Sequence, residues 1–322
     1  MTNYNQVIEN SRAYKIILQD KKQNKLSHTY LLISEDQEYC HAFAKNVAKI
    51  ILDAENKEQT LVKIEKDIHP DVIVLGKNEK ISTEMASNLS SDVYVRPFEE
   101  DNKIYVLLNL DDTQEEAQNK LLKTIEEPPK SVFFLLCAKT ERKLLQTVLS
   151  RSKKIELDLL TIPQIQMLLE QNGVDKKTAE ICSACSAGVF ARAYKMATDK
   201  EFLELYQNVY KCLYEMNSSR DVLKFASIFS QKNVNKDELS DIFMLLVRDL
   251  IMVKVGKSEL VQNTHLLSQM KLICEGFSIS ALYKIVEYCL QLKEDLVYNT
   301  NSVEMVDEFL LKIVEAKVKC KK

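Results

Sequence analysis

Two cysteines, Cys182 and Cys185, have the Cys-x-x-Cys spacing that zinc sites use. A structural zinc site needs four ligands, and neither a second such pair nor nearby histidines accompany this one. We therefore interpret both cysteines as small buried residues on a helix and expect no bound metal. The eight cysteines are scattered along the chain, which is typical of the reducing cytoplasm.

Glycine spacing excludes another kind of chemistry. The chain has five glycines, at Gly76, Gly173, Gly188, Gly256 and Gly276. The motifs G-x-G-x-x-G and G-x-x-x-x-G-K-[ST] need glycines two to five residues apart, because backbone N–H groups must approach a phosphate closely. No pair here meets that spacing. We therefore expect no standard phosphate-binding loop and no bound cofactor.

Composition places the chain among globular proteins of two or three domains. Its 322 residues are 46% hydrophobic and carry a net charge of −3, so a chain-wide basic surface for nucleic acid is excluded. The longest run without a charged residue is eleven residues, short of the roughly 20 that a membrane helix needs. The first residues do not resemble a signal peptide. We expect a cytoplasmic protein without membrane contact.

Two parts of the chain differ in pattern. The five prolines all lie at or before Pro163, and apolar runs alternate with helical spacing over residues 22 to 160, which predicts a parallel α/β sheet. Apolar positions after residue 162 follow a helical period. We predict an α/β domain over residues 1–160, a small helical domain over 161–203 and a larger one over 204–322. The expected strands are 28–34, 71–75, 103–108, 132–138 and 154–157.

One segment carries a family resemblance. Residues 118–129 read Gln-Asn-Lys-Leu-Leu-Lys-Thr-Ile-Glu-Glu-Pro-Pro, and a buried strand, a short helix and Ser150-Arg151-Ser152 follow in order. Upstream are His28-Thr29-Tyr30 and His69-Pro70-Asp71. This series resembles clamp-loader subunits of the AAA+ superfamily. The resemblance implies an AAA+-like sheet domain, a helical lid and a C-terminal helical collar for oligomerisation. Residues 296–311, with Asn299 and Asn301, resemble the family's final collar helix.

The nucleotide site departs from the family pattern. Ser34, Gln37 and Tyr39 stand where the phosphate loop has glycines, Cys40 replaces the lysine, and His41 replaces the Ser/Thr that binds Mg²⁺. The neighbouring carboxylates Glu35, Asp36 and Glu38 would repel a triphosphate. Without glycines and a lysine, the loop lacks the groups that hold phosphate.

The acidic half of the site also departs from the pattern. Leu108 and Asn109 fall where the Mg²⁺-coordinating and catalytic acids belong, and Asp111 is the acid that remains. We therefore expect a degenerate phosphate loop, no productive ATP binding and no intrinsic ATPase activity. His28 and His41 show no Cys or carboxylate partner in the sequence for acid–base work.

Arg151, with Ser150, is the candidate functional residue. Taken alone, it would be read as a surface arginine paired with an acid. In the family, the serine-arginine motif offers a guanidinium in trans to a neighbouring subunit's ATP, where such arginine fingers contribute about 10³ to 10⁵ in rate. Ser152 stands where the family usually has cysteine. The resemblance implies a non-hydrolysing subunit of the DNA polymerase III clamp loader, which loads the sliding clamp onto primed DNA.

The resemblance also implies partners. These are the gamma/tau ATPase subunits and the delta subunit, with the clamp and primed DNA reached through the assembled complex. Arg192 lies where active relatives have a second sensor arginine, and here we expect it to be either structural or a relic. Four lysines are candidates either for template contact or for a solvated face: Lys120, Lys123, Lys139 and Lys143.

Three other functions stay open at this point. A gamma/tau-type ATPase would bind ATP tightly as an isolated chain. A delta-type, clamp-opening subunit would bind the clamp strongly by itself. A helical scaffold unrelated to replication would associate with no polymerase subunit.

Overall fold

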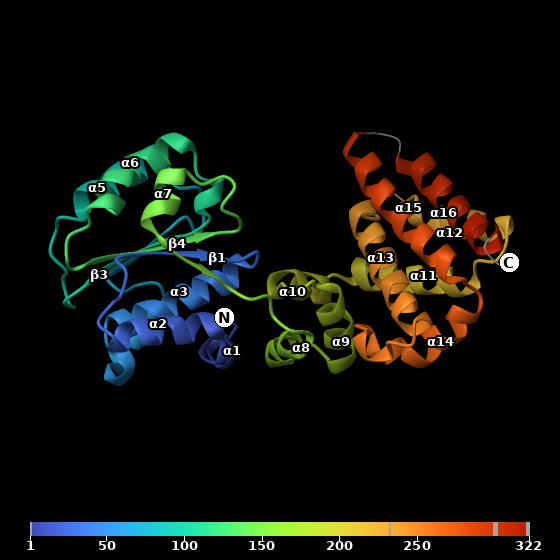
Figure 1. Cartoon of the computed structure of the whole chain (residues 1–322), viewed down its shortest axis with the longest axis horizontal. Coiled ribbons are helices and arrows are strands. Elements are labelled where there is room, and N and C mark those ends of the chain that lie inside the picture. The colour runs from blue at the N-terminus through green and yellow to red at the C-terminus, as the bar shows by residue number, and fades with distance from the viewer. Residues whose placement is uncertain (1, 232, 299–301, 320–322) are drawn as a thin grey trace. The chain divides into compact units, whose positions relative to one another are not determined.

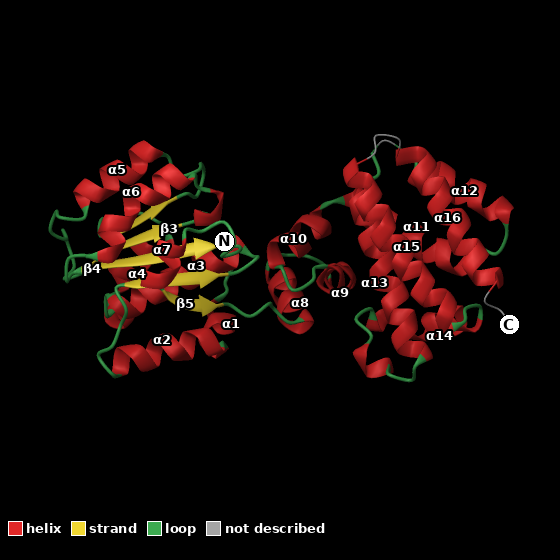
Figure 2. Cartoon of the chain, turned by 45° about the horizontal axis from the view of Figure 1, so that its top comes forward, coloured by secondary structure: helices red, strands yellow, loops and turns green. Residues whose placement is uncertain are grey.

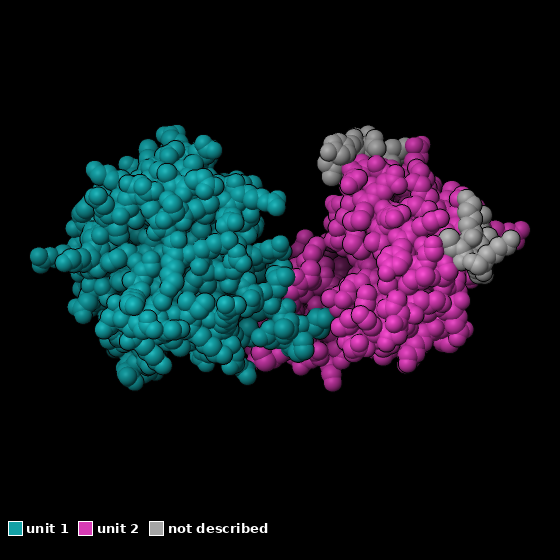
Figure 3. Space-filling model, in the orientation of Figure 1, with its two compact units in different colours: residues 1–164, 189–191 teal, residues 165–188, 192–322 magenta. Residues whose placement is uncertain are grey.

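A computed structural model describes residues 2–231, 233–298 and 302–319, so Asn299 and Asn301 lie outside the described residues. The chain divides into two compact units, which Figure 3 colours separately. Unit 1 is Met1–Gln164 with Val189–Ala191, and unit 2 is Ile165–Gly188 with Arg192–Lys322. The predicted boundary between domains at residues 203 and 204 falls inside unit 2, so the three-domain organisation stays a prediction.

Unit 1 contains a parallel five-stranded sheet with the order β2-β3-β4-β1-β5, as Figure 2 shows in yellow. The strands are β1 (Thr29–Ile33), β2 (Val72–Leu75), β3 (Lys103–Leu107), β4 (Val132–Ala138) and β5 (Lys153–Glu156). Every residue of the central strand β4 is buried, because helices cover both faces of a parallel sheet. The predicted α/β class and the predicted strands are confirmed, and no strand boundary differs by more than one residue.

Helices flank this sheet on two sides (Figure 1). Residues of α5, α6 and α7 share one apolar core with the strands, and α3 contacts β1 and β4 from the other side. The helices of unit 1 are α1 (Asn5–Asn10), α2 (Arg12–Lys22), α3 (Gln37–Ile51), α4 (Glu58–Glu65), α5 (Thr83–Asp92), α6 (Glu115–Glu126) and α7 (Gln146–Arg151), with short 3₁₀ turns at Ala54–Asn56 and Leu110–Asp112. Because all strands are parallel, their carboxyl ends meet along one edge, and the candidate site lies there.

The described part of unit 2 is helical, as the absence of proline predicts. Its helices are α8 (Ile162–Gln171), α9 (Lys176–Cys185), α10 (Phe190–Thr198), α11 (Lys200–Glu215), α12 (Ser219–Phe229), α13 (Lys236–Lys254), α14 (Leu267–Glu275), α15 (Ile279–Tyr298) and α16 (Ser302–Lys319), with 3₁₀ turns at Ser258–Leu260 and Thr264–Leu266. The first residues of α8 and α10 belong to unit 1.

Helix α13 is central to the core of unit 2. Its Phe243 ring makes edge contacts with Phe309 of α16 and Phe229 of α12, at centroid distances of 5.1 and 5.9 Å. Such aromatic pairs stabilise a core beyond their buried area. Over the described ranges, no helix combines the length and apolar character needed to cross a membrane.

Candidate functional site

The predicted degenerate phosphate loop connects β1 to α3 at the carboxyl edge of the sheet. Ser34 is buried, and its hydroxyl accepts a hydrogen bond from the Asp36 N–H at 3.2 Å. The Gln37 side-chain amide donates to the Ser34 carbonyl at 2.6 Å. The loop is therefore closed by its own side chains, at the positions where glycines would leave backbone N–H groups open to a ligand.

Asp36 is the N-cap of α3 and is only 2% exposed. Its Oδ1 accepts the Tyr39 N–H at 3.0 Å, and its Oδ2 accepts the Ala191 N–H at 3.1 Å. The first N–H groups of a helix have no partner within the helix and favour an anion. The chain's own carboxylate thus lies where the resemblance would place a phosphate. We expected Asp36 only to repel a phosphate, although an Asp at a helix start is also a signal for an N-cap.

Three aromatic rings pack beside this cap. The Tyr4 ring lies 5.6 Å from the Tyr39 ring and 5.6 Å, edge-on, from the Phe190 ring. All three side chains are buried. Burial, with a contribution from the charge of Asp158, raises the pKa of Tyr39 to about 12, so its hydroxyl stays neutral. Tyr39, which the resemblance places at the third loop glycine, is therefore part of a buried aromatic cluster.

Cys40 is the residue that the resemblance places at the position of the phosphate-binding lysine. Its side chain is fully buried, and its thiol donates to the Leu32 carbonyl across 3.7 Å. Burial, together with a hydrogen bond to Cys137, raises the pKa of the Cys40 thiol well above its ordinary value. A neutral, buried thiol supplies no charge to a phosphate.

His41 belongs to an ionic cluster instead of a metal site. Its Nε2 lies 3.1 Å from Oδ1 of Asp67, which Lys45 approaches to 2.8 Å and with which Lys77 also forms an ion pair. The expectation that His41 lacks a carboxylate partner is therefore wrong, because Asp67 is remote in sequence and arrives through the fold. Burial lowers the pKa of His41 to about 4, so the imidazole is neutral at pH 7.

The acidic half of the predicted site follows β3. Leu108 is buried, and Asn109 donates its side-chain amide to the Gly76 carbonyl at 3.0 Å. Asp111 is buried and accepts the Lys139 N–H at 3.1 Å. Each of these residues contributes to the connections between strand ends, which is a structural role.

Arg151 is the last residue of α7, and its side chain is 39% exposed. Its Nε lies 2.9 Å from Oε1 of Glu126, and its Nη1 donates to the Thr147 carbonyl and the Ser150 hydroxyl, both at 3.1 Å. The guanidinium is thus oriented on the surface by one carboxylate and two oxygens of its own helix. The predicted pair Ser150 and Arg151 is in contact.

Gln118 connects α6 with the start of α7. Its side-chain amide donates to the carbonyls of Thr113 and Lys143, and its Oε1 accepts the Leu145 N–H at 3.2 Å. The side chain is 1% exposed. The motif of residues 118–129 therefore positions the helix that carries Arg151.

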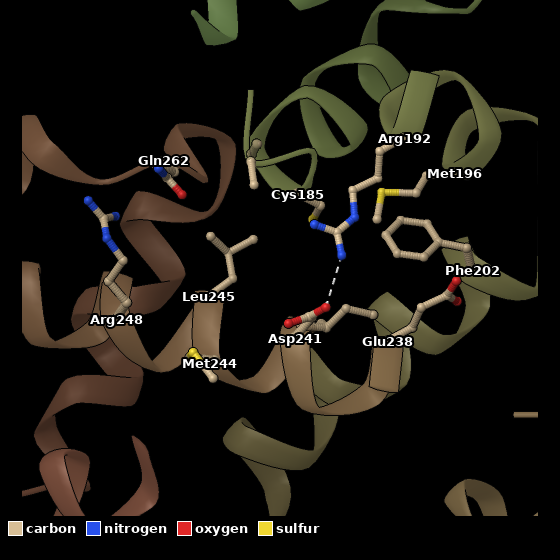
Figure 4. A pocket seen from close by; sticks show the side chains of 13 residues that line it. Cys185, Arg192, Met196, Phe202, Glu238, Asp241, Met244, Leu245, Arg248 and Gln262 are labelled. Atoms are coloured by element: carbon tan, nitrogen blue, oxygen red, sulfur yellow. Dashed lines mark hydrogen bonds and ion pairs between the residues drawn. The ribbon is translucent and has the colours of Figure 1, made fainter. Parts of the chain in front are cut away.

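Arg192 lies in unit 2, at a pocket of about 230 Å³ (Figure 4). Its Nη2 lies 3.1 Å from Oδ2 of Asp241 on α13, and Lys293 of α15 forms an ion pair with the same carboxylate. Cys185 lies in the pocket wall. The expectation that Arg192 is structural or a relic stays a prediction.

The four candidate lysines are exposed. Lys120 lies 3.9 Å from Glu116 and Lys143 lies 3.9 Å from Asp112. Their contact with DNA stays a prediction. Among the described residues, no group of three or more His, Cys, Asp or Glu side chains could hold a metal ion.

Two family models match this chain, and relatives with the same subunit name match most of its length. The family model described as "DNA polymerase III, delta subunit" matches residues 9–161, and "DNA polymerase III, delta subunit, C terminal" matches residues 200–313. DNA polymerase III subunit delta' of Bacillus subtilis is 23% identical over 94% of this chain and 96% of the relative. Subunit delta' of Buchnera aphidicola subsp. Baizongia pistaciae is 25% identical over 86% of this chain and 88% of the relative.

Two further matches are more distant or partial. DNA polymerase III subunit tau of Escherichia coli is 33% identical over 33% of this chain and 17% of the relative. A solved gamma subunit-related protein from Thermotoga maritima has a TM-score of 0.43 at 17% identity, covering 94% of this chain and 99% of the other.

Proposed function

Because the chain belongs to the DNA polymerase III delta-prime family of clamp-loader subunits, we propose that it serves in that loader without hydrolysing ATP and offers Arg151 to a neighbouring subunit's ATP. In this role it would help load the sliding clamp onto primed DNA. Its partners would be the gamma/tau ATPases and the delta subunit, in the cytoplasm where the bacterial chromosome lies.

The packing of the loop between β1 and α3 is the observation that supports the proposal. The buried thiol of Cys40 replaces a cation, and the carboxylate of Asp36 already holds the N–H of Tyr39. A triphosphate approaching this helix would meet a negative charge where it needs positive ones. Binding would require the loop to release its own hydrogen bonds, which is why we expect no turnover by this chain.

The exposure and orientation of Arg151 support the proposal that it acts on the ATP of a neighbouring subunit. A guanidinium that acts in trans must be exposed and oriented at an element end, and Arg151 is both. Its ion pair with Glu126 is exposed, and such pairs contribute about 0 to 1 kcal/mol. A neighbour's γ-phosphate, with more charge and better fork geometry, can therefore displace Glu126.

Reconstitution with the gamma/tau and delta subunits of the same organism tests the proposal. We expect a stable assembly whose ATPase activity rises with primed DNA and clamp, while the isolated chain neither binds nor hydrolyses ATP. Tight ATP binding by the isolated chain would instead identify a gamma/tau-type subunit. Strong binding of the isolated chain to the clamp would identify a delta-type subunit, and failure to assemble would remove the proposal.

A further inference from the structure

The carboxylate of Asp36 joins the first turns of two helices. Tyr39 is the third residue of α3, and Ala191 is the second residue of α10. One carboxylate oxygen accepts each N–H, at 3.0 and 3.1 Å. The first four N–H groups of an α-helix have no partner in its own hydrogen-bond ladder. Tyr39 and Ala191 supply such N–H groups at the starts of α3 and α10. A single side chain therefore satisfies donors from segments more than 150 residues apart.

Two helix N-termini around one anion form the arrangement in which proteins bind phosphate. Here the anion is covalently part of the chain, and it is 2% exposed. The rings of Tyr4, Tyr39 and Phe190 pack against one another next to it. In such a dry environment a hydrogen bond to a charged acceptor is stronger than in water. Burial, with Asp36 as the next contributor, raises the pKa of Tyr4, so this neighbour adds no second negative charge at neutral pH.

We propose that Asp36 is a positioning residue that takes the place of a ligand phosphate and, within unit 1, keeps residues 189–191 fixed against the start of α3 at all times. This inference rests on the proposed function, since it explains how a subunit without nucleotide keeps an ordered site. In a subunit with an open phosphate loop, the anion arrives with the ligand and leaves with it. In this chain the anion is permanent, so the position of residues 189–191 does not depend on nucleotide.

Removing the carboxylate tests the inference on the isolated chain. We expect Asp36→Ala to accelerate amide hydrogen exchange at Tyr39 and Ala191 at least about tenfold, because both N–H groups lose a charged acceptor. We expect inorganic phosphate, added at tens of millimolar, to slow both amides again and to raise the melting temperature of this variant. Phosphate should not produce either effect in the unmodified chain.

Asp175→Ala is the matched control. Asp175 is the N-cap of α9 and accepts one N–H, that of Thr178, at 3.1 Å, but it is exposed and joins no second helix. Its removal should accelerate exchange locally, without an effect at Ala191 and without recovery in phosphate. Equal recovery of both variants would show a general salt effect and would overturn the inference.

Asp36→Asn is a second variant for the same exchange measurement, in case Asp36→Ala does not fold. An asparagine can still accept the Tyr39 N–H through its oxygen, whereas its amide nitrogen cannot accept the Ala191 N–H. We expect faster exchange at Ala191 with smaller change at Tyr39. Unchanged exchange at Ala191 would overturn the inference. ATP binding by the unmodified chain would refute the proposed function instead, so the two failures can be told apart.

Discussion

The Nε of Arg151, the last residue of α7, lies 2.9 Å from Oε1 of Glu126, the last residue of α6. The pair joins the ends of two helices, and Gln118 fixes α6 against the start of α7. The contacts within the chain engage Nε and Nη1, and Nη2 carries two further N–H donors. The ion pair with Glu126 therefore orients the Arg151 guanidinium, and an anion that binds more strongly can take the place of Glu126.

Arg151→Ala tests the role of this guanidinium in catalysis. We expect the variant to fold and to assemble with its partner subunits, because the lost pair is exposed. The rate of ATP hydrolysis at the neighbouring subunit's site should fall about 10³-fold, since the guanidinium of an arginine finger stabilises the charge of the transition state. DNA-stimulated ATP hydrolysis by the assembled loader measures this.

Arg142→Ala provides the control for net charge. Arg142 is exposed in the segment before α7, and its removal should leave the ATPase rate unchanged. An equal rate for the Arg151→Ala and unmodified complexes would contradict the assignment of Arg151.

Restoring a lysine to the loop should not restore an ATP site. Cys40 is fully buried against the Leu32 carbonyl, so Cys40→Lys places a charge without a partner in the core. We expect a loss of about 4 kcal/mol in the free energy of unfolding. Urea denaturation measures this, and Cys40→Ala should cost much less. A stable Cys40→Lys protein that binds ATP would contradict this prediction, because the loop would then open to admit the nucleotide.

His41 should make the stability of the protein depend on pH. Its pKa is lowered to about 4 by burial, whereas it is near 6.5 in the unfolded chain. Between these values the unfolded chain binds more protons, so stability falls as pH falls. The pKa shift of His41 leaves the free energy of unfolding unaffected well above pH 6.5. At pH 4 it lowers the free energy of unfolding by roughly 3 kcal/mol.

His41→Gln isolates this contribution from the other acids and histidines. The difference in unfolding free energy between the two proteins, followed by denaturant melts from pH 7 to pH 4, should narrow as pH falls. A difference that stays constant over this range would mean that His41 is not buried in its neutral form.

Gly76 should be intolerant of any side chain. Its φ is +81°, and a Cβ there would lie 2.2 Å from the Leu108 carbonyl oxygen, so the ends of β2 and β3 would have to separate. We expect Gly76→Ala to cost about 3 kcal/mol or more. Gly173, at φ +84° with open space around it, is the matched control, and Gly173→Ala should cost only about 1 kcal/mol. Thermal melts compare the two, and equal losses would show that the clash is relieved at no cost.

Much of unit 1 was predictable because its signals are local. Apolar runs such as Val132–Ala138 are long enough to indicate a buried strand, and two prolines after Glu127 end a helix. The absence of glycine from residues 34–41 is also plain in the sequence, whereas the assignment of Cys40 to the lysine position depends on the family resemblance. The partner of His41 did not follow, because Asp67 lies 26 residues away and reaches it only through packing.

The order and types of residues were enough to predict an α/β part followed by an all-α part, which the structure confirms, and to propose a degenerate phosphate loop with Arg151 in the family motif. Those properties depend on residue type, spacing and order. The hydrogen-bond partners of the loop before α3 could be known only from the folded chain. Asp36 is one of three neighbouring acids in the sequence, and it becomes a buried cap because folding brings the N–H of Ala191 to a carboxylate already fixed at the start of α3.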